Sequence, residues 1–271
     1  MPTVDAIVLL GWLERDAAVK FLVNECVFDA PLSEAEAERI WEPWRVTVEA
    51  LPERLALAPE RLPIDSFHAR EVRKEFLNRY KGAKNILDVI RIDPMGLVVH
   101  QLWVITDRSG IYRTRVETRR GWLEHALLCN DRNALPTLNM RAGANWIDIE
   151  IPHAEFILTA DQRRGIHIQQ LAGHVNVTEF GGRMMLWAGY HRSYARMLSI
   201  APDAMDRSLL VTLTTDGIPG SPNQGERTIL TVPRPPLFGD FFDARFFMNV
   251  KFRKRRFELR VRAQIVPVDE T

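Results

Sequence analysis

The sequence has few cysteines, no long hydrophobic run and almost no net charge, and each absence excludes a class of protein. Cys26 and Cys129 each stand alone, without a C-x-x-C pair, which argues against a zinc site and a disulfide framework. Both are expected to be buried thiols in a reducing cytoplasm. No apolar run is long enough to span a bilayer, and no stretch resembles a signal peptide. We therefore predict a cytoplasmic protein without a membrane partner.

Charge and motif content exclude further classes. The 36 basic and 35 acidic residues leave a formal net charge of +1, too little to recruit nucleic acid or an anionic membrane through a global field. No Walker A or G-x-G-x-x-G sequence is present, so the common ATPase and Rossmann folds lack their key glycines. His153 and Glu155 form an H-x-E pair, but no P-C-x-x-C follows, which excludes a zinc deaminase. No metal is expected.

The hydrophobic pattern changes along the chain. With 271 residues, one large domain or two small ones can form. Residues 1–88 are predicted to be mainly helical, and the strongest signal is a capping sequence with Ser33 as N-cap and Glu36 three residues later. From residue 89 the apolar period becomes two, as in strands. We therefore predict an α+β fold, with a helical N-terminal region over residues 1–88 and a mixed-sheet domain over residues 89–271.

The most informative stretch lies between residues 174 and 198. Residues 174–180 alternate between apolar and polar side chains, and residues 183–188 are mainly apolar. Gly181 and Gly182 between them suit a tight turn, so the two segments are predicted to be the arms of a β-hairpin. The second strand is predicted to end at Gly189, and a helix is predicted to begin directly after it. The turn therefore lies at the exit of a hairpin.

A strand-to-helix turn of this kind predicts an anion site. The first N–H groups of a helix are unpaired and carry the positive end of the peptide dipoles, so they favour phosphate. Gly189 lacks the Cβ that would keep a ligand from the backbone, and the adjacent basic side chains add donors. His191 can act as a general base, but a role as phosphate donor is favoured. The candidate ligand-binding residues are Gly189, His191, Arg192, Ser193, Arg163 and Arg164.

The motif Gly189-Tyr190-His191-Arg192, followed by a helix and a strand over residues 208–213, resembles the ParB/sulfiredoxin-like superfamily. The resemblance covers residues 148–215. It implies a mixed α+β domain whose turn holds nucleotide phosphates through Gly189, His191 and Arg192, with CTP or ATP and Mg²⁺ as ligand. Tyr190 stands where sulfiredoxin has its reactive cysteine, which excludes thiol chemistry there. Hydrolysis is not indicated, because no acidic pair for magnesium is identifiable, and enzymatic activity is left open.

Basic residues near the C-terminus support an alternative. Residues 246–266 are predicted to form a closing hairpin with one apolar and one basic face. Its charge can bind a phosphate backbone, which suggests a nucleic-acid-interacting or scaffold protein without enzymatic activity. The same charge can protect an edge strand from aggregation. The candidate nucleic-acid-binding residues are Lys251, Arg253, Lys254, Arg255 and Arg256.

Two further interpretations remain open. A helix predicted over residues 66–80 carries a basic face that includes Arg70 and Arg73, interpreted as a solvated face or, alternatively, as a nucleic-acid contact. The Gly189 turn can also be purely structural, with Arg192 paired to an internal carboxylate.

Overall fold

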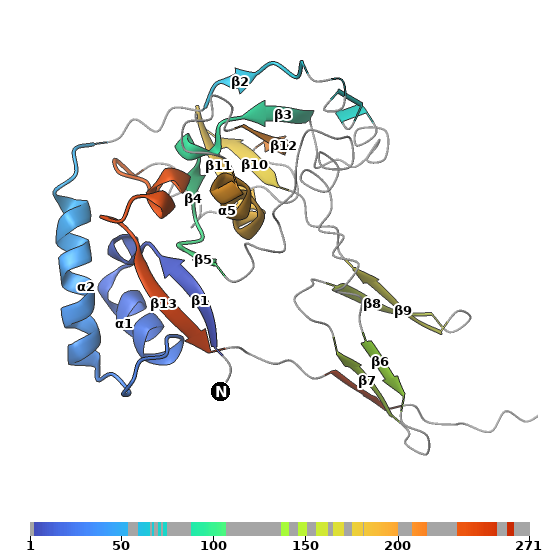
Figure 1. Ribbon diagram of the computed structural model, residues 1–271, viewed down its shortest axis with the longest axis horizontal. Coiled ribbons are helices and arrows are strands. Elements are labelled where there is room, and N and C mark those ends of the chain that lie inside the picture. Colours follow the sequence, from blue (N-terminus) through green and yellow to red (C-terminus); the bar gives the residue numbers. More distant parts are fainter. Residues whose placement is uncertain are drawn as a thin grey trace, which may run out of the picture. The chain divides into compact units, whose positions relative to one another are not determined.

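A computed structural model describes much of the chain as an α+β protein, as predicted, with helices and with mixed and antiparallel sheets (Figure 1). No helix in the described part of the chain is both long and apolar enough to cross a bilayer. The described residues are 3–53, 59–65, 67, 70–71, 73–74, 88–106, 137–140, 146–150, 156–161, 165–170, 175–180, 182–199, 208–215, 232–253 and 259–262.

The chain forms two compact units and passes between them three times, and the predicted boundary at residue 88 coincides with none of these junctions. The first unit contains Met1–Cys129 and Gly173–Lys254, and the second contains Asn130–Ala172 and Arg255–Thr271. The first unit therefore joins the N-terminal helices to strands from the middle and the end of the chain. Strand pairing between distant segments decides this division, and hydrophobic periodicity does not report such pairing.

The first element is a strand, although the N-terminal region was predicted to be mainly helical. Thr3–Val8 forms β1, at the centre of an antiparallel sheet in the order β13-β1-β5. Its partners are β5 (Trp103–Ile105) and β13 (Met248–Arg253). Ala6 and Val8 pack into a core with the helices, whereas Ile7 packs into the larger core on the other side. Burial on both faces explains why this segment is continuously apolar rather than alternating.

Two helices cover one face of this sheet (Figure 1). They are α1 (Arg15–Asn24) and α2 (Glu34–Glu49), and the short 3₁₀ helix η1 (Leu10–Trp12) leads into them. The predicted capping box is confirmed: Ser33 Oγ accepts the Glu36 N–H, and the Ser33 N–H donates to the Glu36 carboxylate at 2.8 Å. The Ser33 hydrogen bonds also hold the pKa of Glu36 below its usual value.

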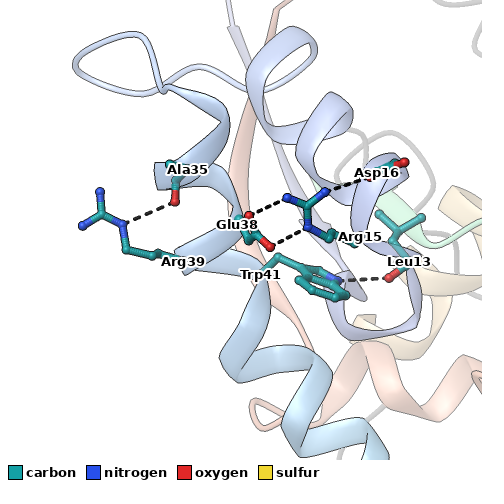
Figure 2. A network of polar contacts seen from close by, with 7 residues as sticks. All are labelled: Leu13, Arg15, Asp16, Ala35, Glu38, Arg39 and Trp41. Atoms are coloured by element: carbon teal, nitrogen blue, oxygen red, sulfur yellow. Dashed lines mark hydrogen bonds and ion pairs between the residues drawn. The ribbon is translucent and has the colours of Figure 1, made fainter.

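Polar contacts fasten α1 to α2 (Figure 2). The Arg15 guanidinium donates to both carboxylate oxygens of Glu38, at 2.5 and 2.7 Å. The indole N–H of Trp41 donates to the carbonyl of Leu13 at 3.0 Å. A two-pronged arginine–carboxylate contact fixes orientation as well as distance, so the helices are held in register at their N-terminal ends.

The prediction that Cys26 is buried is confirmed. Its thiol is buried and unbridged in the core beneath α1, and burial raises its pKa to about 12. A thiol with so little thiolate is chemically inert at neutral pH. Cys129 lies outside the described residues.

The second sheet of this unit has six strands in the order β2-β3-β12-β10-β11-β4. The predicted hairpin is confirmed, since β10 and β11 pair in antiparallel fashion and the helix α5 follows at once. The next strand, β12, runs parallel to β10, and β4 runs parallel to β11. The bounds are β2 Arg61–Leu62, β3 Asp88–Ile92, β4 Val98–Val99, β10 Asn176–Phe180, β11 Arg183–Ala188, α5 Tyr190–Ser199 and β12 Leu209–Thr215.

One continuous core joins this sheet, α5 and the second face of β1. Two 3₁₀ helices close it, η2 (Pro94–Gly96) and η5 (Phe238–Phe242), and Phe238 and Phe241 of η5 are fully buried. The segment after Gly96 forms β4 and β5, which belong to different sheets. The chain leaves the six-stranded sheet after Val99 and joins the first sheet at Trp103.

The second unit contains five described strands. β6 (Thr137–Met140), β7 (Trp146–Glu150) and β14 (Leu259–Arg262) form an antiparallel sheet, and β8 (Phe156–Asp161) pairs with β9 (Gly165–Gln170). The predicted C-terminal hairpin is therefore corrected. Its two described strands, β13 and β14, pair with β1 and β7 in different units. Alternation within each strand was visible in the sequence, but alternation does not specify a partner.

Candidate functional site

The Gly189 turn has the backbone that the sequence predicts. β11 ends at Ala188, Gly189 adopts a φ of +93°, and α5 begins at Tyr190. The N–H of Ser193 donates to the carbonyl of Gly189 at 2.9 Å and closes the first helical turn. A left-handed residue between a strand and a helix favours glycine, because any Cβ is strained there.

The space beside Gly189 is filled by protein. A Cβ at this position would lie 2.9 Å from both Cα and Cγ2 of Val175, the residue that precedes β10. The missing side chain therefore allows two backbone segments to pack closely together. Val175 thus makes the close approach to the Gly189 backbone that was predicted for a ligand.

Tyr190 ties the turn to the segment between β4 and β5. Its hydroxyl accepts the N–H groups of His100 at 3.0 Å and Gln101 at 3.3 Å, and it donates to the carbonyl of Leu186. The side chain is only 3% exposed. The buried hydroxyl of Tyr190 therefore connects three backbone groups.

The two basic side chains of the turn differ in exposure: His191 is half-buried and Arg192 is buried. Nδ1 of His191 accepts the N–H of Ile105 in β5 at 3.1 Å, so in the neutral ring the proton lies on Nε2. Arg192 is only 6% exposed, and Ser193 is fully buried. Ligand binding at this turn stays a prediction, and so does the alternative in which Arg192 pairs with an internal carboxylate.

Other predicted site residues are only partly described. Lys251 is exposed on β13, and Arg253 is the last residue of that strand. Five more predicted residues lie outside the described part of the chain: Arg163, Arg164, Lys254, Arg255 and Arg256. Nucleic-acid binding by the C-terminal basic residues remains a hypothesis.

A cavity of about 400 Å³ lies elsewhere in the first unit, beside β2 and β3. Its lining combines four arginines with one aspartate and four aliphatic side chains. Its volume falls within the range of small-molecule sites, about 300–1,000 Å³. The lining residues are Arg61, Leu62, Ile64, Arg70, Arg73, Asp88, Val89, Ile90 and Arg91.

Three of the four arginines are held by neighbouring groups. Arg73 donates to Oδ1 of Asp88 at 2.7 Å, and Arg61 donates to Glu179 of β10 at 2.9 Å. Arg91 donates to Oγ of Ser208 at 2.6 Å and to the carbonyl of Pro63 at 2.8 Å. These contacts orient the guanidinium groups around the cavity while Arg61 and Arg73 stay partly exposed.

Arg70 differs from the other three. It is exposed and makes no hydrogen bond or ion pair with the described residues. It lies one helical turn before Arg73, so both are on the same helix face. The cavity thus combines one uncommitted cation with three pre-oriented ones, which suits an anion.

The chain matches no family model, no curated protein and no solved structure. Its candidate site therefore depends on geometry and chemistry. Within the described residues, no three of the metal-binding types His, Cys, Asp and Glu cluster as ligands. The cavity is consequently interpreted through its arginines.

Local patterns in the sequence mark three of the four arginines that line this cavity. Arg70 and Arg73 belong to the basic helix face that was noted but interpreted mainly as solvated. Arg91 is the polar position in the otherwise apolar Val89-Ile90-Arg91-Ile92, which marks a side chain directed away from the core. Arg61 joins them only because β2 pairs with β3, and that pairing has no local signal.

Proposed function

We propose that this protein binds a phosphate-bearing small ligand in the arginine-lined cavity beside β2 and β3. The observation that carries the proposal is a cavity of about 400 Å³ that has four arginines among its lining residues. Guanidinium forks match phosphate oxygens in geometry and remain charged at any physiological pH. The aliphatic wall of Leu62, Ile64 and Val89 supports an organic part beside the phosphate.

The ParB/sulfiredoxin-like relationship remains part of this proposal. It is supported by the order hairpin, Gly189 turn, α5 and β12, and it makes nucleotides such as CTP or ATP, with Mg²⁺, the first ligands to test. The proposal differs from that superfamily in the position of the phosphate. Arg192 and Ser193 are buried, whereas Arg70 is exposed at a cavity.

A thermal-shift screen tests the proposal. CTP, ATP with and without Mg²⁺, and small phosphate monoesters are added to the purified protein. At a hundredfold excess over its dissociation constant, a ligand stabilises the folded state by about 2.7 kcal/mol. We expect Arg70→Ala to abolish the shift and Arg39→Ala to preserve it. Arg39 is a matched control, since it is exposed on α2 and its guanidinium contacts Ala35 of its own helix (Figure 2).

The variant Arg192→Gln distinguishes the two candidate phosphate sites, the arginine-lined cavity and the Gly189 turn. If the cavity binds the ligand, the folded variant retains the ligand-induced shift even though its melting temperature is lower. A folded Arg192→Gln protein that loses the shift, together with an Arg70→Ala protein that keeps it, would return the site to the Gly189 turn. No shift with any phosphate compound would refute phosphate binding altogether.

A further inference from the structure

We infer that Asp88 makes the arginine-lined cavity selective for one class of phosphate monoester. The ligands of this class carry a hydrogen-bond donor, either an ammonium or a hydroxyl group, near the phosphate. The inference rests on the proposed phosphate binding and adds the class of ligand. Asp88 is the one carboxylate among the lining residues, and its side chain is about one-third exposed.

The two oxygens of Asp88 have different surroundings. Oδ1 accepts three hydrogen bonds: from Nε of Arg73 at 3.1 Å, from Nη2 of Arg73 at 2.7 Å, and from the N–H of Val89 at 2.7 Å. Oδ2 has no partner among the described residues. The carboxylate is thus anchored through one oxygen, and its second oxygen remains available to a ligand.

A carboxylate in an anion site has a defined effect on selectivity. It disfavours a negative group placed directly beside Oδ2, and it leaves Oδ2 without a donor when the ligand is a bare phosphate. A ligand that places an ammonium or hydroxyl group at Oδ2 removes both penalties and gains a charge-assisted hydrogen bond. The arginines therefore recognise the phosphate, and Asp88 distinguishes what is attached to it.

The probes are methyl phosphate, which has no additional donor, glycerol 3-phosphate, which has hydroxyl groups, and phosphoethanolamine, which has an ammonium group. Calorimetric titration of the full-length protein measures each dissociation constant. We expect phosphoethanolamine or glycerol 3-phosphate to bind at least about tenfold more tightly than methyl phosphate, the ratio that one charge-assisted hydrogen bond provides. Whichever of these two probes binds more tightly shows whether Asp88 prefers an ammonium or a hydroxyl donor.

Asp88→Asn tests the residue directly. Asparagine retains an oxygen for Arg73 and Val89 but removes the charge, so the preference is expected to fall to within about twofold while methyl phosphate binds more tightly. Glu179→Gln is the matched control. Glu179 also pairs with a cavity arginine, Arg61, but it is not a lining residue. This control is expected to change the affinity for all three probes by the same factor and to leave the preference intact.

The outcomes distinguish the inference from the function on which it rests. Equal affinity of the unmodified protein for the three probes would overturn selection by Asp88 and leave phosphate binding standing. Glu179→Gln could also lose the preference to the same extent as Asp88→Asn. That result would show that the preference comes from the electrostatic field of the nearby charges rather than from contact with Asp88, and it would also overturn the inference. If none of the three probes binds, both the proposed function and the inference fail.

Discussion

The Gly189 turn and the arginine-lined cavity contain the same kind of residue in opposite environments. At the turn, Arg192 is only 6% exposed, and the half-buried His191 accepts a backbone N–H from β5. At the cavity, Arg70 is exposed and Arg61 and Arg73 are partly exposed beside carboxylates. A phosphate can reach the second group without displacing protein.

The difference shows what a local motif specifies. A glycine between a strand and a helix specifies backbone geometry, and that geometry is present in this chain. It does not specify whether the space in front of the glycine belongs to a ligand or to another strand. Here Val175 occupies that space, so the turn contributes stability. Substitutions at the turn should therefore affect unfolding, and substitutions at the cavity should affect binding.

Gly189→Ala should have the largest effect on stability. The left-handed φ of +93° costs an L-residue about 1–2 kcal/mol. The contact of the new Cβ at 2.9 Å with Val175 adds an overpacking cost of about 1–3 kcal/mol. The free energy of unfolding, measured by urea denaturation followed by tryptophan fluorescence, should fall by the sum of these terms.

Gly182→Ala is the matched control for the close approach. Gly182 also has a positive φ, +76°, but no atom lies within 4 Å of the position of its Cβ. Only the backbone cost of about 1–2 kcal/mol applies. Equal losses in the two variants would show that packing against Val175 contributes nothing, and the space beside Gly189 would again be open to a ligand.

Tyr190→Phe should have the next largest effect. The substitution leaves two backbone N–H groups and one carbonyl without the hydroxyl that connects them, at a cost of about 1–3 kcal/mol. Tyr194→Phe is the control, because its ring is equally buried and stacks on Phe242, but its hydroxyl has no hydrogen bond among the described residues. That variant should change stability by less than about 0.5 kcal/mol. A loss as large as that of Tyr190→Phe would show that the hydroxyl contacts are not the cause.

The parts of the fold that sequence predicted are those with local signals. The capping box at Ser33 and the β10–β11 hairpin each depend on residues within a few positions of one another, and both are confirmed. The strand β1 was missed because burial on both faces removes the alternation that identifies a half-buried strand. The C-terminal hairpin was wrong because pairing partners are chosen by contacts across the whole chain.

In the candidate site, too, the features with a local sequence signal were visible in the sequence, and those that depend on long-range pairing were not. The basic helix face with Arg70 and Arg73 was visible as a periodic pattern, but its charge alone could not distinguish a solvated face from a binding site. Arg61 and Leu62 join the lining only because β2 pairs with β3, which places Arg61 opposite Ile92 and Leu62 opposite Arg91. That part of the lining depends on a contact between segments about 30 residues apart in the sequence, which no local pattern encodes.

The smallest effect is expected for Glu38→Gln, which removes an arginine–carboxylate pair whose two residues do not line the cavity. The hydrogen bond from Arg15 holds the pKa of Glu38 below its usual value. The stability difference between the unmodified protein and the variant should therefore be present above the ordinary glutamate pKa of about 4.3 and disappear as the pH falls through the lower pKa of the folded state. Because the pair is solvent-exposed, the difference is small and should decrease further in high salt. Urea denaturation at several pH values measures this difference in stability, and the phosphate affinity of the same variant should match that of the unmodified protein.

A change in phosphate affinity as large as that of Asp88→Asn would mean that any exposed arginine pair on this unit influences the anion, and the distinction between the cavity and the rest of the surface would be lost.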